Sequence, residues 1–215
     1  MSSIAIIDYG MGNLHSIAKA IEHVAGKERV FVSSDPATIL AADRVVFPGV
    51  GAIRDCISEL QRTGLDDVVR QAAATRPLLG ICLGLQALLD ASEENDGTPC
   101  LGIVPGSVLR FRSDMPDPVS GLRLKIPHMG WNQVHQVRAH ALWKDIPPDS
   151  RFYFVHSYYA VPTDPVHIAG TTPYGQDFAS AVARDNLFAV QFHPEKSQHA
   201  GLQLLANFIA WNGEP

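Results

Sequence analysis

Basic charge and long apolar runs are both scarce in this sequence. Its 215 residues hold 17 lysines and arginines against 22 aspartates and glutamates, a formal net charge of −5. A protein that binds nucleic acid through its phosphates needs a basic surface, which this composition does not favour. No apolar run approaches the ~20 residues that a membrane-spanning helix requires. We therefore expect neither nucleic acid nor a membrane as a partner.

Cysteine is also rare. Cys56, Cys82 and Cys100 form an odd set without the spacing of metal ligands. Such a set is typical of free thiols in a reducing compartment. The first ten residues lack the positively charged segment of a secretory signal. We expect a soluble, cytoplasmic protein with no metal and no cofactor, and we assign no role to Cys56 or Cys100.

The first half of the chain alternates between apolar strands and amphipathic helices. The hydrophobic content of 46% is typical of a folded protein, and without repeats or long linkers we expect a single domain over 1–215. This alternation predicts a parallel sheet covered by helices. The expected strands are 3–8, 29–33, 44–48 and 77–81, and the expected helices are 13–25, 35–42, 52–64, 65–76 and 83–94.

From about residue 100 the expected strands are shorter and turns are frequent, which indicates an antiparallel extension of the sheet. Residues 112–125 contain two prolines and mixed charge, which predicts a surface loop. The expected strands are 107–111, 130–137, 151–161, 166–172, 178–184 and 187–192, followed by a helix at 200–212.

The stretch "LLGICLGLQ" places Cys82 between Gly80 and Gly84, after an apolar strand and before an apolar helix. A nucleophile elbow has this order, because flanking glycines allow a tight turn that leaves the side chain exposed above the sheet. The start of a helix there favours the thiolate, and the amide of Leu83 would face a developing oxyanion. On these residues alone, Cys82 is either a nucleophile or a small side chain packed at a turn.

Two further segments favour catalysis. "VQFHPEKS" places His193 and Glu195 after an apolar strand, where a base and the acid that orients it could reach the same cleft. "FPGVGA" follows another strand, and its glycines allow backbone amides to face an oxyanion. Taken singly, these segments could also be a surface histidine, an exposed charged pair and an ordinary turn.

Together these motifs resemble the class I glutamine amidotransferases. "IIDYGMGNLHS", "FPGVGA", "GICLGLQ", "PHMGWN", "YFVHSYY" and "QFHPEKS" occur in this order along the whole chain. The more discriminating "DYGMGNL" and "PHMGWN" make the chain similar to the glutaminase subunits of imidazole glycerol phosphate synthases. The resemblance implies a three-layer α/β/α, flavodoxin-like fold with a mostly parallel central sheet and an antiparallel extension.

The resemblance also implies hydrolysis of L-glutamine to glutamate and ammonia through a thioester. It implies a nucleophile at Cys82, a base at His193 and an orienting acid at Glu195. The oxyanion hole would be formed by Leu83, Val50 and Gly51. The residues that match glutamine-binding positions are Gln86, Glu94, Ser157 and Tyr158, and a carboxylate such as Glu94 suits the substrate's α-ammonium group.

In the family that the chain resembles, ammonia passes into a (β/α)₈ cyclase subunit, with which the chain would form a heterodimer. There it would react with a nucleotide to give imidazole glycerol phosphate and aminoimidazole carboxamide ribonucleotide, in histidine biosynthesis. Trp131, in a polar turn context, fits an interface anchor, or else a half-buried strand aromatic. The residues that match interface or gate positions are Asn13, Met129, Trp131, Asn132, Tyr153 and Lys196.

Three other functions compete with this hypothesis. One is the glutaminase subunit of a different amidotransferase, serving pyridoxal phosphate, anthranilate or carbamoyl phosphate synthesis, against which "PHMGWN" and "VHSYY" argue. Another is a non-catalytic regulatory subunit, which the intact Cys82, His193 and Glu195 disfavour. The third is a stand-alone cysteine hydrolase, which would be highly active without a partner.

Overall fold

The structure is a computed structural model that describes residues 2–117 and 121–214. Its helices and 3₁₀ turns are α1 (Leu14–Ala25), α2 (Pro36–Ala41), α3 (Ile53–Thr63), α4 (Leu65–Thr75), α5 (Leu83–Ala87), α6 (Gln198–Ala210), η1 (Glu94–Asp96), η2 (Ala141–Trp143), η3 (Pro165–His167) and η4 (Pro194–Lys196). Its strands are β1 (Ser3–Ile7), β2 (Arg29–Ser33), β3 (Arg44–Gly49), β4 (Leu78–Cys82), β5 (Ala91–Ser92), β6 (Thr98–Pro99), β7 (Gly106–Arg110), β8 (His128–Gln133), β9 (His135–Gln136), β10 (Arg151–His156), β11 (Tyr158–Pro162), β12 (Ile168–Pro173), β13 (Asp177–Arg184) and β14 (Leu187–Val190).

The described residues form one 12-stranded sheet and a separate pair, β8 and β10. The main sheet has the order β2-β1-β3-β4-β14-β13-β11-β7-β5-β6. The five strands from β2 to β14 run parallel to their neighbours, and β13 then begins the antiparallel part. Because β3, β4 and β14 are parallel, their carboxyl ends meet at one edge of the sheet.

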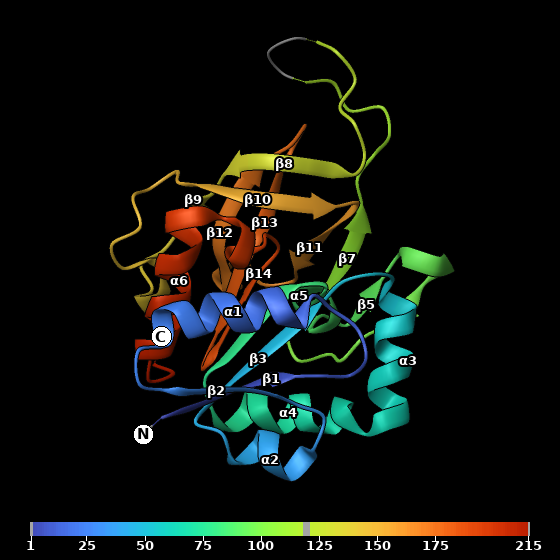
Figure 1. Cartoon of the computed structure of the whole chain (residues 1–215). Helices are drawn as coiled ribbons and strands as arrows, with labels where there is room; N and C mark the ends of the chain where they lie inside the picture. The colour runs from blue at the N-terminus through green and yellow to red at the C-terminus, as the bar shows by residue number, and fades with distance from the viewer. Residues whose placement is uncertain (1, 118–120, 215) are drawn as a thin grey trace.

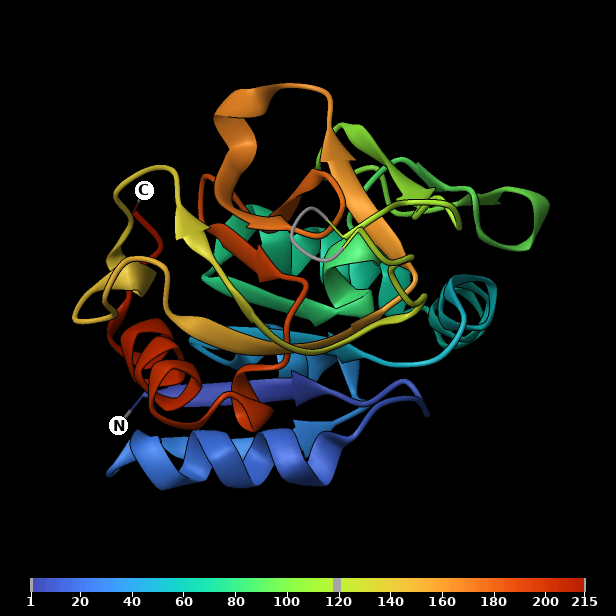
Figure 2. The same ribbon diagram turned by 90° about the horizontal axis from the view of Figure 1, so that it is seen from above.

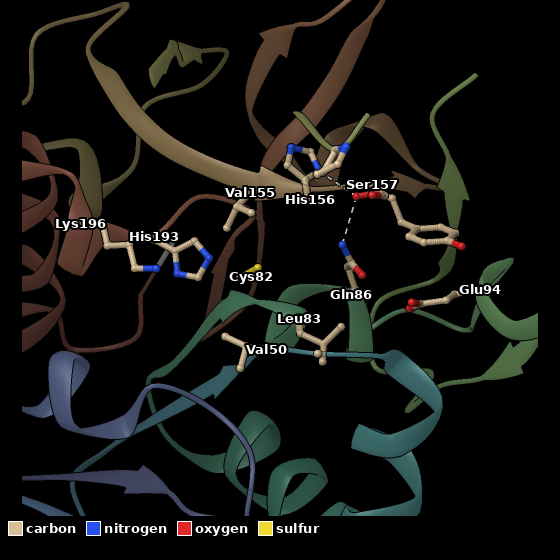
Figure 3. A pocket seen from close by; sticks show the side chains of 13 residues that line it. Val50, Cys82, Leu83, Gln86, Glu94, Val155, His156, Ser157, His193 and Lys196 are labelled. Carbon is tan, nitrogen blue, oxygen red and sulfur yellow. Dashed lines mark hydrogen bonds between the residues drawn. The ribbon is translucent and has the colours of Figure 1, made fainter. Parts of the chain in front are cut away.

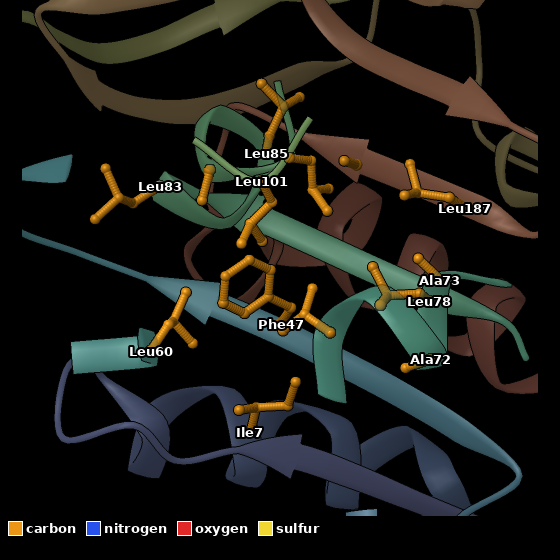
Figure 4. Close-up of a cluster of buried hydrophobic side chains, with 14 of the residues drawn as sticks. Ile7, Phe47, Leu60, Ala72, Ala73, Leu78, Leu83, Leu85, Leu101 and Leu187 are labelled. Atoms are coloured by element: carbon orange, nitrogen blue, oxygen red, sulfur yellow. The ribbon is translucent and has the colours of Figure 1, made fainter. Parts of the chain in front are cut away.

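Helices cover both faces of the sheet, which gives three layers (Figures 1 and 2). On one face, α1 and α6 pack against each other, and their apolar residues share a core with Phe152 and Phe154 of β10. On the other face, α2 to α5 enclose a second core (Figure 4) in which Phe47 is fully buried. The α/β fold with an antiparallel extension predicted from the sequence is confirmed.

Local signals explain where several elements begin. Asp35 caps α2 by accepting a hydrogen bond of 2.7 Å from Thr38 N, and Pro36 takes the first helical position. Residues 112–117 and 121–125 form an irregular loop that extends away from the sheets, as the sequence predicted (Figure 1). Residues 118–120 of that prediction lie outside the described part of the chain.

Three predicted elements were wrong in extent. The helix expected at 83–94 ends at Ala87, because the backbone amides of residues 101–104 donate to the carbonyls of residues 87–89 and so end the helical ladder. The strand expected at 151–161 breaks at Ser157, which separates β10 in the small sheet from β11 in the main sheet. Similarly, the strand expected at 130–137 is two strands, β8 and β9, in different sheets.

Candidate active site

Cys82 lies on a sharp turn between β4 and α5. Its backbone has φ 55° and ψ −108°, a conformation that costs a residue other than glycine about 1–3 kcal/mol. A Cβ on the neighbouring Gly84 would lie 2.1 Å from Phe47 O, so only glycine lets α5 approach β3 this closely. The Cys82 side chain reaches the pocket of Figure 3, although the residue is only 7% exposed. The geometry is that of the predicted nucleophile elbow.

His193 and Glu195 lie beside this turn, at the carboxyl end of β14. His193 Nδ1 and Glu195 Oε1 are 2.9 Å apart, and the two side chains are 4% and 1% exposed. His193 Nε2 is buried and has no hydrogen-bond partner among the described residues. Burial alone would lower the pKa of His193, but Cys82 and Glu195 favour the charged ring and together raise the pKa to about 10. This environment favours an imidazolium paired with the Cys82 thiolate.

The turn that carries His193 is tied to β10 and α6. His193 N donates to Tyr153 O at 2.9 Å. Ser197 Oγ donates to His193 O at 2.6 Å and accepts from Tyr153 N at 3.0 Å. A Cβ on Gly201 would lie 1.9 Å from Pro194 O, so α6 packs directly on the turn. These contacts restrict the position of the ring relative to Cys82.

A pocket of about 340 Å³ opens above Cys82, a volume suited to a small molecule. Most residues assigned to catalysis or substrate binding from the sequence line it. They are Val50, Gly51, Cys82, Leu83, Gln86, Glu94, Ser157, Tyr158 and His193. The pocket is completed by Pro127, Val155, His156 and Lys196. Segments distant in the sequence thus surround one cavity (Figure 3).

Two of the predicted substrate-binding side chains also make contacts within the protein. Glu94 Oε2 accepts a hydrogen bond of 3.0 Å from Ile53 N, at a start of α3 where Ala52 supplies no side-chain cap. Gln86 Nε2 donates to Gln191 Oε1 at 2.9 Å and to Tyr158 O at 3.1 Å. Both side chains are therefore held in place at the pocket wall.

The predicted interface residues lie mainly on β8, β10 and η4. Met129 and Trp131 are 62% and 40% exposed. The Trp131 and Tyr153 rings meet edge to face at 6.2 Å, and Lys196 Nζ lies 5.8 Å from the centre of the Tyr153 ring. By contrast, Asn132 turns to the opposite face, where Nδ2 donates to Pro173 O at 2.8 Å.

The remaining predicted interface residue, Asn13, has a local role in the structure. Its Oδ1 accepts a hydrogen bond of 3.4 Å from Ser16 N at the start of α1. The residue follows β1, whose carboxyl end lies at the same sheet edge as that of β4 because the intervening pairs are parallel.

Three buried polar residues near the pocket were missed by the sequence analysis. Gln191 is fully buried, and its Nε2 lies 3.7 Å from Cys82 Sγ. His128 and His156 are 3% and 6% exposed, and they contact each other at 2.9 Å. The signal available for Gln191 was a polar residue in the apolar run "LFAVQF", two positions before His193. The histidines lie within "PHMGWN" and "YFVHSYY", but nothing in those motifs shows that they meet.

Across residues 2–117 and 121–214, no cluster of three or more histidine, cysteine, aspartate or glutamate side chains is arranged to hold a metal ion. None of the helices in these ranges combines the length and apolar character needed to cross a membrane.

Known proteins are similar to this chain in sequence and in fold. The family described as glutamine amidotransferase class-I matches residues 5–211. Imidazole glycerol phosphate synthase subunit HisH of Nitrosococcus oceani is 67% identical over 213 residues, which cover 99% of both chains. The protein of the same name in Methylococcus capsulatus is 62% identical over 98% of this chain and 97% of its own length. The structure of PurLQS from Thermotoga maritima matches with a TM-score of 0.72 at 15% identity, over 97% of this chain and 98% of that one, a likeness in fold alone.

Proposed function

The chain belongs to the class I glutamine amidotransferase family, and from that premise we propose that it is the glutaminase subunit of an imidazole glycerol phosphate synthase. The observation that carries this proposal is that Cys82 and His193 line one pocket, with Glu195 in contact with His193 Nδ1 at 2.9 Å. The relatives that bear the synthase name match nearly the full length of the chain, which supports the choice among amidotransferases.

The proposed reaction begins when the Cys82 thiolate attacks the side-chain amide carbon of L-glutamine. A C–S bond forms, and the carbonyl π electrons move to the oxygen, whose charge the amides of Leu83 and of the 50–51 segment stabilise. The oxyanion collapses to a thioester, and the C–N bond breaks as protonated His193 gives its proton to the leaving ammonia. His193 then takes a proton from water, which attacks the thioester and releases glutamate and the thiolate.

The remaining pocket residues are proposed to orient the reactants. Glu195 stabilises the imidazolium of His193 and fixes its ring through the contact at Nδ1. Glu94, held through one carboxylate oxygen by Ile53 N, offers its other oxygen to the substrate's α-ammonium group. Gln86, Ser157 and Tyr158 line the pocket and are proposed to contact glutamine.

The ammonia is proposed to pass to a cyclase subunit with a (β/α)₈ barrel, in the cytoplasm. The exposed side chains of Met129 and Trp131, together with Tyr153 and Lys196, offer an aromatic and apolar surface beside the pocket. Asn13 is proposed to complete the docking region, and Asn132 is proposed to support it from the opposite face of β8. The cyclase would combine ammonia with a phosphoribulosyl formimino carboxamide nucleotide.

We further propose that the chain alone is nearly idle, because uncoupled hydrolysis would waste glutamine. The "PGVG" segment provides a means of switching, since Gly51 has φ +98° and a peptide flip there would complete the oxyanion hole. Binding of the cyclase with its nucleotide would favour the active arrangement.

The test is glutamate release from L-glutamine by the chain alone, with a cyclase from the same source, and with cyclase plus nucleotide. We expect a large rise only in the last condition. Rapid turnover by the chain alone would contradict the switch and favour a stand-alone hydrolase. No release in any condition, with Cys82 shown to be unmodified, would favour a non-catalytic subunit.

The matched control is Cys82→Ala in the complete complex. This variant should lose glutamine-dependent synthesis of the two products, because no thioester can form. It should retain synthesis from added ammonia, because the cyclase does not need the thiol. Loss of both activities would contradict the role proposed for Cys82.

A further inference from the structure

A single backbone carbonyl, that of Tyr158, joins two series of hydrogen bonds beside the active site. Tyr158 O lies 3.1 Å from Gln86 Nε2 and 2.8 Å from His156 Nδ1. A carbonyl oxygen can only accept, so both nitrogens must carry the hydrogen. This fixes the orientation of the Gln86 amide and the tautomer of a neutral His156.

The first series runs from this carbonyl to the nucleophile. The second hydrogen on Gln86 Nε2 is donated to Gln191 Oε1 at 2.9 Å. Because the oxygen of Gln191 faces Gln86, its Nε2 must face the other way, and it lies 3.7 Å from Cys82 Sγ. The Gln191 side chain is fully buried, so it has no room to exchange these partners for water.

The second series runs to the inner face of β8. With its hydrogen on Nδ1, neutral His156 accepts at Nε2 from His128 Nδ1 at 2.9 Å. His128 therefore accepts at Nε2, where Asn132 Nδ2 lies 3.3 Å away. Asn132 is oriented independently, because the same Nδ2 donates to Pro173 O and its Oδ1 accepts from Gln133 N. Backbone groups thus set the orientation at both ends.

The surroundings keep both histidines neutral and in place. Burial lowers the pKa of His128 to about 4 and that of His156 to about 3. Aromatic rings surround the pair, with His128 stacked on Phe154 at 4.9 Å and Phe111 within 5.3 Å of His156. In the neutral state each ring uses one donor and one acceptor, so the histidine pair is fully satisfied.

We propose that Gln191, His156 and His128 are positioning residues that orient the Cys82 thiolate and hold the Gln86 wall of the glutamine pocket. They link Cys82 to Asn132 on the strand whose outer face carries Met129 and Trp131. The inference deepens the proposed function, because it rests on Cys82 acting as the nucleophile. Gln191 contributes by donating a hydrogen bond that is stronger to a thiolate than to a thiol.

The test measures alkylation of Cys82 in the full chain by iodoacetamide as a function of pH, followed by mass spectrometry of the Cys82 peptide. The assay needs neither glutamine nor a cyclase. In Gln191→Met, which keeps the side-chain length without the donor, the midpoint of the alkylation profile should rise by about one pH unit, a tenfold change in thiolate stability. Gln191→Glu should raise it further, because a carboxylate would face the thiolate.

Cys100 provides the internal control, because it does not line the pocket and its Sγ contacts Thr98 O, so its alkylation should be the same in every folded variant. An unchanged Cys82 profile in Gln191→Met and Gln191→Glu would overturn the inference. A Cys82 that reacts no faster than Cys100 in the unmodified chain would overturn the proposed function, and the inference with it.

The second series of hydrogen bonds, which runs through the two histidines, is tested by a pair of variants. His156→Asn keeps an N–H near the position of Nδ1, whereas His156→Leu removes it. His156→Leu should raise the Cys82 midpoint and the KM for glutamine, and His156→Asn should restore most of both. Combined with Gln191→Met, His156→Leu should add little to the midpoint shift, because its effect passes through Gln191. Equal effects of the two His156 variants, or fully additive shifts in the double variant, would overturn the role proposed for the second series of hydrogen bonds.

Discussion

At the scale of single residues, the contact between Glu195 and His193 controls the charge of the proposed base. Glu195→Gln preserves the shape of the side chain but removes the charge that favours the imidazolium. We expect the pKa of His193 to fall from about 10 and kcat for glutamine hydrolysis to fall by about 10²–10⁴. The measurement is kcat and kcat/KM against pH in the complex with cyclase and nucleotide.

The matched control for that variant is Glu22→Gln, on the exposed side of α1. It changes net charge equally and should leave both parameters unchanged. A Glu195→Gln enzyme with the kcat and pH profile of the unmodified chain would contradict the role of Glu195.

The residues of the site were not equally predictable. Cys82 and His193 could be found because a nucleophile between glycines and a histidine after an apolar strand both have local signatures. Gln191 could not be found in the same way, because its function depends on the direction of its amide. That direction is set by Tyr158 O, which acts through Gln86. A sequence pattern carries no information about such a chain of contacts.

At the scale of elements, the elbow depends on close contact between α5 and β3. Gly84→Ala would place a methyl group 2.1 Å from Phe47 O, in a strand whose residues are all buried after Arg44. We expect the free energy of unfolding to fall by about 3 kcal/mol or more, because neither backbone can move without disturbing the core. Glutaminase activity should be lost even in the fraction that remains folded, because Leu83 and Cys82 shift with α5.

Urea unfolding followed by circular dichroism measures this effect, with Gly64→Ala as the control. Gly64 has φ +69° and no atom within 4 Å of the position that a methyl group would take, so alanine there adds backbone strain without a clash. Its cost should be about 1 kcal/mol. Equal costs at the two positions would contradict the packing argument.

Element boundaries were less predictable than element types. The alternation up to β4 was sufficient for the parallel sheet, because each strand and helix has its own periodic pattern. The end of α5 at Ala87 depends on hydrogen bonds from residues 101–104, which a local pattern cannot reveal. The break at Ser157 likewise separates strands of two different sheets within a stretch that predicts a single strand.

At the scale of the whole molecule, buried histidines make stability depend on pH. Burial is the largest cause that lowers the pKa of His128 and His140 to about 4 and that of His156 to about 3. In the unfolded chain each would bind a proton near its ordinary pKa of about 6.5. Between these values the unfolded state binds more protons, so the free energy of unfolding must fall as the pH is lowered below about 6.5.

His193 affects stability over a different pH range. Its raised pKa contributes stability that is complete below about pH 6.5 and is lost as the pH rises towards 10.

Measurements below about pH 6.5 therefore separate the effect of the neutral histidines on stability from that of His193. We expect each to lower the free energy of unfolding by about 1–2 kcal/mol at about pH 5 relative to about pH 7.5. Urea unfolding at these two pH values measures the difference. His156→Asn should reduce that difference by the contribution of one histidine, about 1–2 kcal/mol, even if the variant is less stable at both pH values. A His156→Asn difference equal to that of the unmodified chain would contradict the conclusion that His156 is neutral in the folded protein, and would require its proton to be accommodated between Tyr158 O and His128 Nδ1.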